Sequence, residues 1–170
     1  LHVAGKHMVQ NALAALTVAQ LLHVPDDAAL SALAAFRPGA GRSDVIRTDR
    51  FTIIDGSYNC NPTSMEAALN VLKAAKGRTV CIFGDMLELG ENAPVYHARI
   101  GAYAKKCGVD RMLTVGTLAR NAAFDPNDAY DSVEALLVAL PSLLCDGDTI
   151  LVKASFGMHL KTVVDALKTM

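Results

Sequence analysis

The sequence has no uninterrupted apolar run of the roughly 18 residues from which a membrane-spanning helix is built. Asp, Lys, Asn or Gly interrupts each apolar stretch after a few positions, so no membrane partner is expected. The first ten residues, LHVAGKHMVQ, have neither a basic start followed by an apolar block nor a small-residue cleavage site, and they do not begin with Met. We therefore expect a cytoplasmic protein, and we interpret residue 1 as a point inside a longer chain.

A surplus of basic residues is also absent. The chain has 16 Lys and Arg residues against 17 Asp and Glu residues, which gives a formal net charge of −1. Domains that bind nucleic acid usually carry a basic surplus, because the phosphate backbone supplies much of their affinity. A nucleic-acid partner is therefore not expected.

The cysteines show no metal-binding or disulfide pattern. There are four of them, and no two form a C-x-x-C pair. Such spacing suits neither a zinc site nor the disulfide framework of a small secreted domain. We interpret them as reduced thiols that pack as small buried residues, with Cys60 as the exception because its neighbours are polar; the others are Cys81, Cys107 and Cys145.

Several motifs with known chemistry are missing. No G-x-x-x-x-G-K-[ST] phosphate loop and no G-x-G-x-x-G after a strand occurs, so residues outside this chain would have to supply the main grip on a nucleotide. There is no G-x-S-x-G nucleophile elbow. The five histidines lack H-x-x-x-H and H-E-x-x-H spacing, which argues against a zinc enzyme. We expect His97 to be a partly exposed helix residue and not a catalyst.

The residues that are present predict one α/β domain preceded by two helices. The chain has 170 residues, of which 52% are hydrophobic and 19% charged, so it can bury one core. Ala- and Leu-rich segments predict helices over residues 7–22 and 28–36, the second with an N-cap at Asp26 or Asp27. The segment 38–42, PGAGR, marks a domain boundary, because the pattern changes there from helix to short strands.

Downstream of this boundary, strands and helices alternate. Short, mainly apolar runs predict strands buried on both faces of a parallel sheet, at residues 51–55, 79–83, 111–115 and 149–153. Helices are predicted at residues 64–75, 95–107, 132–140 and 157–168. The alternation predicts a Rossmann-like, open and mostly parallel sheet with helices on both faces. An edge strand over residues 44–48 would pair with residues 51–54 through Asp49 and Arg50.

In such sheets the ligand binds outside the carboxyl ends of the strands, so the loops that follow the strands are the candidate site. The loop 55–61 gathers polar side chains that could hold a sugar or a phosphate, or could simply cap the next helix. Asp85 and Glu88 could meet Mg²⁺ or a cationic group of a substrate. Lys153 and Ser155 stand at a helix start, where an anion is favoured.

Five segments together resemble the Mur ligases, ATP-dependent amide-forming enzymes of bacterial cell-wall precursor synthesis. Residues 5–15, GKHMVQNALAA, resemble the family's G-x-H-N-x-x-N-A-L-A-A helix, and residues 41–42 its G-R. Residues 54–65, IDGSYNCNPTSM, are similar to I-D-D-S-Y-N-A-N-P-x-S-M, and residues 83–90, FGDMLELG, to L-G-D-M-x-E-L-G. Residues 152–156, VKASF, match V-K-G-S-R in part. Of these segments, residues 54–65 and residues 83–90 have patterns that are specific to the branch that joins D-alanyl-D-alanine to UDP-N-acetylmuramoyl-tripeptide.

The resemblance implies a reaction and a role for each candidate residue. ATP phosphorylates the acceptor carboxylate, and the incoming amine attacks the acyl phosphate while domain closure excludes water. ATP and Mg²⁺ are the implied cofactors, and the metal ligands are expected outside this chain. The roles implied by the resemblance are ATP contacts from Asn11 (adenine), Arg42 (phosphates), Asp55, Ser57, Tyr58 and Asn61, catalytic roles for Asn59 and Lys153, and substrate contacts from Asp85, Met86, Glu88 and Ser155.

Four positions depart from the family pattern. Met8 replaces Asn, Gly56 replaces the second Asp of the pair, Ala154 replaces Gly, and Phe156 replaces Arg. Gly56 removes a carboxylate expected near the ribose, and Phe156 removes a guanidinium that could pair with a carboxylate. Folylpolyglutamate synthases carry an Asp-Gly pair at this strand end and are one alternative. The other is a stand-alone Rossmann-like domain that binds a small molecule or a partner.

By the same resemblance, residues 1–38 are the helical end of the central ATPase domain and residues 39–170 are the C-terminal domain. The chain alone is then expected to be inactive, because the phosphate loop and the UDP-sugar domain would belong to missing upstream domains of the same protein. Separated from that central domain, the apolar side chains Leu13, Leu16 and Leu21 are expected to drive self-association or to fold the helical pair back onto the sheet.

Overall fold

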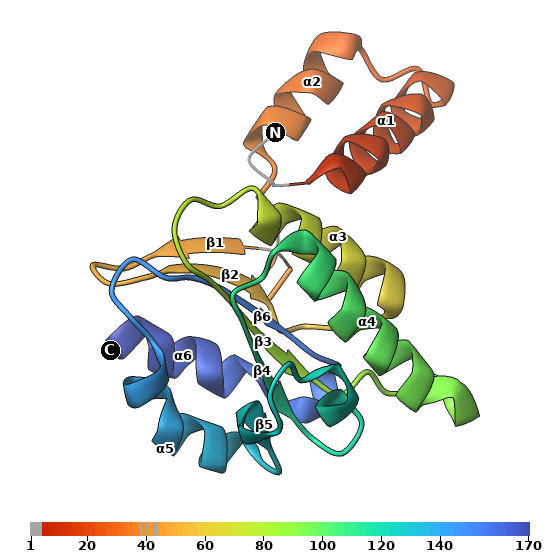
Figure 1. Ribbon diagram of the computed structural model, residues 1–170. Coiled ribbons are helices and arrows are strands. Elements are labelled where there is room, and N and C mark those ends of the chain that lie inside the picture. Colours follow the sequence, from red (N-terminus) through yellow and green to blue (C-terminus); the bar gives the residue numbers. More distant parts are fainter. Residues whose placement is uncertain (1–4, 38, 40, 43) are drawn as a thin grey trace.

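The protein is described here by a computed structural model, which covers residues 5–37, 39, 41–42 and 44–170. Within these residues the chain forms one open, six-stranded sheet in the order β1-β2-β6-β3-β4-β5 (Figure 1). β1 is antiparallel to β2, and the remaining pairs are parallel. The strands are β1 (Asp44–Arg47), β2 (Thr52–Gly56), β3 (Thr79–Gly84), β4 (Arg111–Val115), β5 (Ala129–Tyr130) and β6 (Thr149–Lys153).

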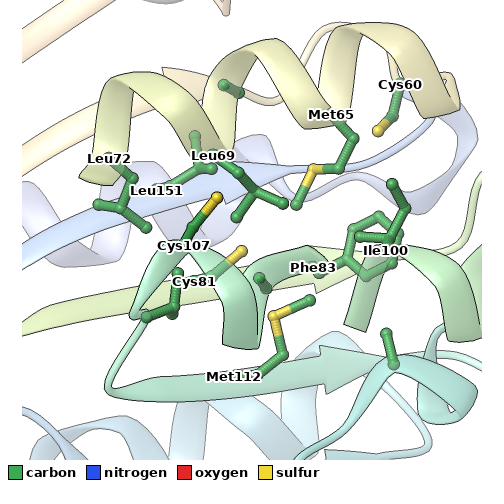
Figure 2. Packing of buried hydrophobic residues seen from close by; sticks show 14 of the residues in the cluster. Cys60, Met65, Leu69, Leu72, Cys81, Phe83, Ile100, Cys107, Met112 and Leu151 are labelled. Atoms are coloured by element: carbon green, nitrogen blue, oxygen red, sulfur yellow. The ribbon is translucent and has the colours of Figure 1, made fainter. Parts of the chain in front are cut away.

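The apolar strands are buried on both faces because helices cover both sides of the sheet. Successive side chains of a strand point to opposite faces, so Cys81 and Phe83 of β3 pack in one core cluster, and Val80 and Ile82 pack in the other. The helices are α1 (Lys6–Leu21), α2 (Asp26–Ala35), α3 (Pro62–Lys73), α4 (Ala93–Cys107), α5 (Val133–Leu143) and α6 (Lys161–Thr169). α3 and α4 cover the first face, shown in Figure 2, and α5 and α6 cover the second.

This arrangement confirms the predicted fold class and, to within one residue at each end, the four predicted central strands. The edge strand is confirmed as well, since Val45 pairs with Ile54 and Arg47 with Thr52 in an antiparallel register. The two-residue strand β5 was not predicted, because so short a segment has no measurable alternation of apolar and polar residues.

Two details of the predicted helices are wrong. The N-cap of α2 is Pro25, and Asp26 and Asp27 lie inside the first turn, where their negative charges favour the positive end of the helix dipole. The predicted helix 157–168 is interrupted at His159, whose φ of 53° is left-handed. A short 3-10 turn, Phe156–Met158, therefore precedes α6, which begins at Lys161.

The helical pair α1 and α2 stands apart from the sheet and its covering helices (Figure 1). The two helices pack on each other through Leu16 and Leu33, which line a small apolar hollow between them. Leu13 and Leu21 remain more than half exposed. The structure therefore does not fold the pair back onto the sheet, and the prediction of self-association stays untested. The expected domain boundary includes Pro38 and Ala40, which lie outside the described residues.

The cysteines differ from expectation at two positions. Cys60 is only 4% exposed, and Figure 2 shows its side chain in the core beside α3, so the exception made for it was wrong. Burial raises the pKa of the Cys60 thiol to about 11. Cys145, expected to be buried, is exposed. It follows α5 in the connection to β6, beyond the apolar face that the helix packs on the sheet.

Candidate active site at the carboxyl ends of the strands

The carboxyl ends of β2, β6 and β3 lie side by side at the centre of the sheet. Gly56 at the end of β2 is the register partner of Lys153 at the end of β6, and Phe83 of β3 pairs with Lys153 from the other side. The loops that follow these strands therefore meet at one edge. Two cavities open there, and the segment Tyr58–Asn61 forms a wall of both.

The loop after β2 begins with a buried polar turn. Oδ1 of Asp55 accepts hydrogen bonds from the main-chain N–H of Ser57, at 3.0 Å, and from its hydroxyl, at 2.6 Å. Both residues are buried, at 2% and 4% exposure. Their side chains are thus used to shape the turn, and neither lines one of the two cavities.

The next residues start helix α3. Oδ1 of Asn61 accepts from the N–H of Ser64 at 2.8 Å, and the N–H of Asn61 donates to Oγ of Ser64 at 3.1 Å, which is a reciprocal capping box. Oδ1 of Asn59 accepts from the N–H of Cys60 at 2.8 Å. The alternative in which loop side chains cap the following helix thus holds for Asn61, while Asn59 fixes its own loop.

Lys153 also fixes the loop after β2. Its ammonium donates a hydrogen bond of 2.7 Å to the main-chain oxygen of Asn59, and the residue is 6% exposed. Burial lowers the pKa of Lys153, and the thiols of Cys60 and Cys81 oppose that shift. At Gly56 a Cβ atom would lie 3.3 Å from Cδ of Lys153. The family's Asp at this position would therefore stand against the lysine stem, and the glycine leaves that space open.

The first cavity, which we call the Lys153 cavity, has a volume of about 380 Å³ and lies between the helical pair and the sheet. Arg42 and Lys153 line it, together with Asn11 from α1. The guanidinium of Arg42 lies 4.0 Å from the centre of the Tyr58 ring, a cation–π contact that orients both side chains. Two cations and an amide suit an anionic ligand such as a phosphate.

The loop after β3 is held on three sides. Oδ1 of Asp85 accepts from the N–H groups of Leu118 and Ala119, at 3.0 and 2.7 Å. The N–H of Ser155 donates to the main-chain oxygen of Asp85 at 3.1 Å. Oγ of Ser155 in turn accepts from the N–H of Leu87 at 2.9 Å. The Asp85 carboxylate is therefore hydrogen-bonded within the fold and does not face a cavity.

His97 makes the third attachment of the loop after β3. The prediction that His97 is partly exposed is wrong, because the residue is completely buried. Its Nε2 accepts from the N–H of Met86 at 2.8 Å, so the ring proton is on Nδ1, which faces the main-chain oxygen of Ala93 at 2.6 Å. The Met86 side chain is also fully buried, so a substrate contact at this position would have to come from the main chain. The burial of His97 could have been inferred from helical spacing, because Ala93, Ile100 and Ala104 lie on the same buried face of α4.

The second cavity, which we call the Glu88 cavity, has a volume of about 590 Å³ and lies between the Tyr58–Asn61 segment and the loops after β3 and β6. Glu88 and Ser155 line it. Glu88 has a φ of 64°, a left-handed conformation that is uncommon for a residue with a side chain.

The two cavities bring together most of the residues expected to form the site. Around the Lys153 cavity these are Asn11, Arg42, Tyr58, Asn59, Asn61 and Lys153, and around the Glu88 cavity they are Tyr58, Asn59, Asn61, Glu88 and Ser155. Asp55, Ser57, Asp85 and Met86 are buried and line neither of the two cavities. Within the described part of the chain, no three His, Cys, Asp or Glu side chains gather closely enough to hold a metal ion. Over the same residues, no helix is long and apolar enough to cross a membrane.

The fold and these cavities can be compared with known proteins. Residues 41–156 match the family model described as Mur ligase, glutamate ligase domain. The chain belongs to the Mur ligase family. The matched residues 41–156 of this Mur ligase domain include every residue that lines the Glu88 cavity except Gly157, and those of the Lys153 cavity from Gly41 to Lys153.

Curated relatives of this Mur ligase chain include UDP-N-acetylmuramoyl-tripeptide–D-alanyl-D-alanine ligases. The one from Escherichia coli K12 is 35% identical over 173 residues, covering 99% of this chain and 38% of the relative. The one from Bacillus subtilis 168 is 32% identical over 176 residues, covering 97% and 38%. The chain thus spans about 38% of the length of these relatives.

Solved structures agree with the family assignment. A crystal structure of MurF from Acinetobacter baumannii superposes with a TM-score of 0.89 at 31% identity, covering 98% of this chain and 38% of that one. Two more distant structures share the fold alone. They are a MurF ligase from Thermotoga maritima in complex with ADP, with a TM-score of 0.85 at 22% identity, and a Mycobacterium tuberculosis folylpolyglutamate synthase, with 0.66 at 18%.

Proposed function

We propose that this Mur ligase domain is the C-terminal part of an ATP-dependent ligase that joins D-alanyl-D-alanine to UDP-N-acetylmuramoyl-tripeptide. The relatives that cover nearly all of the chain carry the name of that activity. The folylpolyglutamate synthase alternative is weaker, because that structural neighbour has a lower TM-score and lower identity than MurF. The loop 83–90 also keeps the G-D-M-x-E-L-G pattern of the D-alanyl-D-alanine branch.

The observation that carries the proposal is the pairing of two cavities of opposite charge across one wall. Arg42 and Lys153 line the first cavity, and Glu88 lines the second, with Tyr58–Asn61 between them. Formation of an amide through an acyl phosphate needs an anionic phosphate and an amine at the same centre. A cationic cavity that adjoins an acidic one suits those two reactants.

In this proposal each group has a defined task. ATP, when bound, supplies the phosphoryl group that activates the acceptor carboxylate. Arg42 and Asn11 contact the nucleotide, and the Lys153 ammonium, buried at the cavity floor, stabilises developing negative charge while it holds the Asn59 main chain in place. Ser155 keeps the loop at Leu87 in position for the incoming amine.

The remaining parts of the ligase belong to the same proposal. Residues 1–38 are the end of the central ATPase domain and residues 39–170 the C-terminal domain, whose closure onto upstream domains excludes water from the acyl phosphate. Those upstream domains would provide the Mg²⁺ ligands and the phosphate loop, so the chain by itself would be inactive. A cytoplasmic location agrees with its four free cysteines.

The decisive experiment is a ligation assay on the intact protein with ATP, UDP-N-acetylmuramoyl-tripeptide and D-alanyl-D-alanine. Product formation that depends on all three is expected. Asn59→Ala should lower kcat/KM by about tenfold or more, because it releases the wall shared by the two cavities.

Asn127→Ala is the matched control, since Asn127 is exposed and lines neither cavity. Its kcat/KM and melting temperature should stay unchanged. If Asn59→Ala lowers the melting temperature and leaves kcat/KM intact, Asn59 only stabilises its own loop and takes no part in the reaction. A gene that has a start codon near Leu1 and no upstream G-x-x-G-K-[ST] motif would contradict the ligase proposal. It would favour the alternative, a stand-alone domain that binds a small molecule or a partner.

A further inference from the structure

One buried imidazole joins the two ends of the loop between β3 and α4. Nε2 of His97 accepts a hydrogen bond of 2.8 Å from the N–H of Met86, and Nδ1 donates to the main-chain oxygen of Ala93 at 2.6 Å. Met86 follows β3, and Ala93 is the first residue of α4. The loop 86–93 is thus closed at its base by a single side chain, which uses both of its ring nitrogens.

The two ends of this loop are supported unequally. At the first end, the N–H of Leu87 also donates to the loop after β6. Further along, Glu88 and Gly90 both have a left-handed φ of 64°. Neither the 3-10 turn Gly90–Asn92 nor the start of α4 has a side-chain cap. The imidazole contact with Ala93 is therefore the side-chain attachment of the second end.

The imidazole is itself fixed by packing. His97 is completely buried, and so is Phe83 of β3, whose ring centre lies 5.5 Å from that of the imidazole. The two ring planes are tilted by 33°. Rotation of the imidazole would leave the N–H of Met86 without an acceptor inside the core, which is unfavourable. The ring therefore holds one orientation in the folded chain.

The loop that His97 closes forms a wall of the Glu88 cavity. Leu87, Glu88 and Leu89 line this cavity, and all three lie between the two attachment points of the imidazole. His97 lines neither the Glu88 cavity nor the Lys153 cavity, so it does not touch a ligand in either of them. An effect of His97 on a reaction must therefore pass through the loop.

We propose that His97 is a positioning residue of the ligase reaction, which holds the loop 86–93 in the conformation that forms the wall of the Glu88 cavity. The inference rests on the proposed function for the reaction itself. Without an imidazole acceptor, the buried N–H of Met86 favours conformations in which the loop opens and this group reaches water. The wall is then present for a fraction of the time, and a substrate that contacts it binds more weakly by that fraction.

Two substitutions separate the attachments of the imidazole. The carboxamide of Gln extends as far as Nε2, so His97→Gln keeps an acceptor for the N–H of Met86. The shorter carboxamide of Asn reaches only as far as Nδ1, so His97→Asn keeps a donor for Ala93 and loses the acceptor. Leu136→Val is the control for stability alone, because Leu136 is a buried residue of α5 in the core cluster on the opposite face of the sheet.

The first measurement is amide hydrogen exchange of the 170-residue chain, followed by NMR. The amide of Leu113 in β4 reports opening of the whole fold and serves as the reference in each variant. Relative to this reference, the Met86 amide should exchange at least about tenfold faster in His97→Asn than in the wild type. In His97→Gln and in Leu136→Val the ratio should stay within about threefold of the wild-type ratio.

The second measurement is the kinetics of the intact protein. In His97→Asn, KM for D-alanyl-D-alanine should rise about fivefold or more, while KM for ATP stays within about twofold. A merely structural residue would not produce this split, because a smaller amount of folded enzyme lowers the apparent kcat and leaves both KM values unchanged. His97→Gln should keep the wild-type KM values, and Leu136→Val should lower the melting temperature with both KM values unchanged.

KM for D-alanyl-D-alanine should thus rise in each variant whose Met86 amide loses protection, and in no other. A rise without that loss, a loss without a rise, or full protection of Met86 in His97→Asn would overturn the inference. Its failure is distinguishable from failure of the ligase proposal, because hydrogen exchange does not require ligation. If the exchange pattern holds and the intact protein makes no amide, the ligase proposal fails and the closure of the loop by His97 remains. If the intact protein ligates and KM does not follow the Met86 amide, the ligase proposal stands and the positioning role fails.

Discussion

The imidazole of His97 and the main-chain N–H of Met86 are joined by a hydrogen bond of 2.8 Å inside the core. His97 belongs to the first turns of α4, and Met86 belongs to the loop that carries Glu88. The bond therefore connects the helix layer to the Glu88 cavity, and it needs an imidazole with an unprotonated Nε2.

Replacement of His97 by Phe should destabilise the fold. Phe keeps an aromatic ring near that of Phe83, which lies 5.5 Å from the ring of His97, but it leaves the buried Met86 N–H without an acceptor. The expected loss is about 1–3 kcal/mol in the free energy of unfolding, measured in urea. Val95→Ala, at an exposed position of the same helix, is the control and should change little. Equal stabilities of wild type and His97→Phe would contradict this role.

Gly101 is a second position where the packing admits no substitution. A Cβ atom there would lie 2.5 Å from the main-chain oxygen of Ala122, in the 3-10 turn Ala119–Ala122 that packs against α4. Because backbone cannot move aside as a flexible side chain can, Gly101→Ala should cost about 2 kcal/mol or more, although Ala is the better helix former. Ala102→Ser, on the exposed side of α4, should stay within about 0.5 kcal/mol. Thermal unfolding of both variants tests the contrast.

The buried thiol of Cys60 predicts a loss of stability at alkaline pH. Its pKa is raised from an ordinary 9.0 to about 11 by burial, against smaller opposing effects of Lys153 and Ser64. Between pH 9 and 11 the unfolded chain releases this proton while the folded chain retains it, so stability is full below pH 9 and falls as pH rises to 11. The expected contribution is about 2–3 kcal/mol.

The measurement is the free energy of unfolding of wild type and Cys60→Ala at several pH values from 8 to 11. The difference between the two proteins isolates this thiol from other groups that titrate in the same range, including Cys81, whose pKa burial also raises. Wild-type stability should decline more steeply with pH than that of the variant. Parallel curves would show that Cys60 ionises equally in both states.

The exposure of Cys145 gives a simpler prediction. Cys60, Cys81 and Cys107 are buried and Cys145 is exposed. Iodoacetamide at pH 8 should therefore add one carbamidomethyl group to the native chain and four in denaturant, counted by mass spectrometry. Cys145→Ser should take up none while folded. Rapid modification of a second thiol in that variant would mean that the core opens more readily than its packing indicates.

The exposed apolar side chains of the helical pair predict self-association. Leu13, Leu21 and Leu22 are each more than half exposed, and no other part of the described chain covers them. Light scattering on the chain should give a mass above that of the monomer, and deletion of residues 1–37 should restore a monomer. A monomeric full chain would show that this apolar surface needs no partner.

The sequence alone determined the architecture, because buried parallel strands and their helices have strong local patterns. Residues 111–115 and 149–153 are apolar runs with β-branched members, and both are strands with the predicted bounds. The polar residues after the strands also identified the correct edge of the sheet, since the carboxyl ends of parallel strands meet there.

Only the tertiary structure decided which of those residues face a ligand. In the sequence, Asp85 and Glu88 are both acidic residues of one loop, and nothing local distinguishes them. In the structure, Asp85 accepts hydrogen bonds from Leu118 and Ala119, more than thirty residues away. Glu88 instead lines a cavity. In the same way His97 became a buried acceptor because the loop at Met86 passes over α4. A carboxylate or an imidazole bonds to whatever the fold brings within about 3 Å of it, and contacts between distant segments leave no local pattern in the chain.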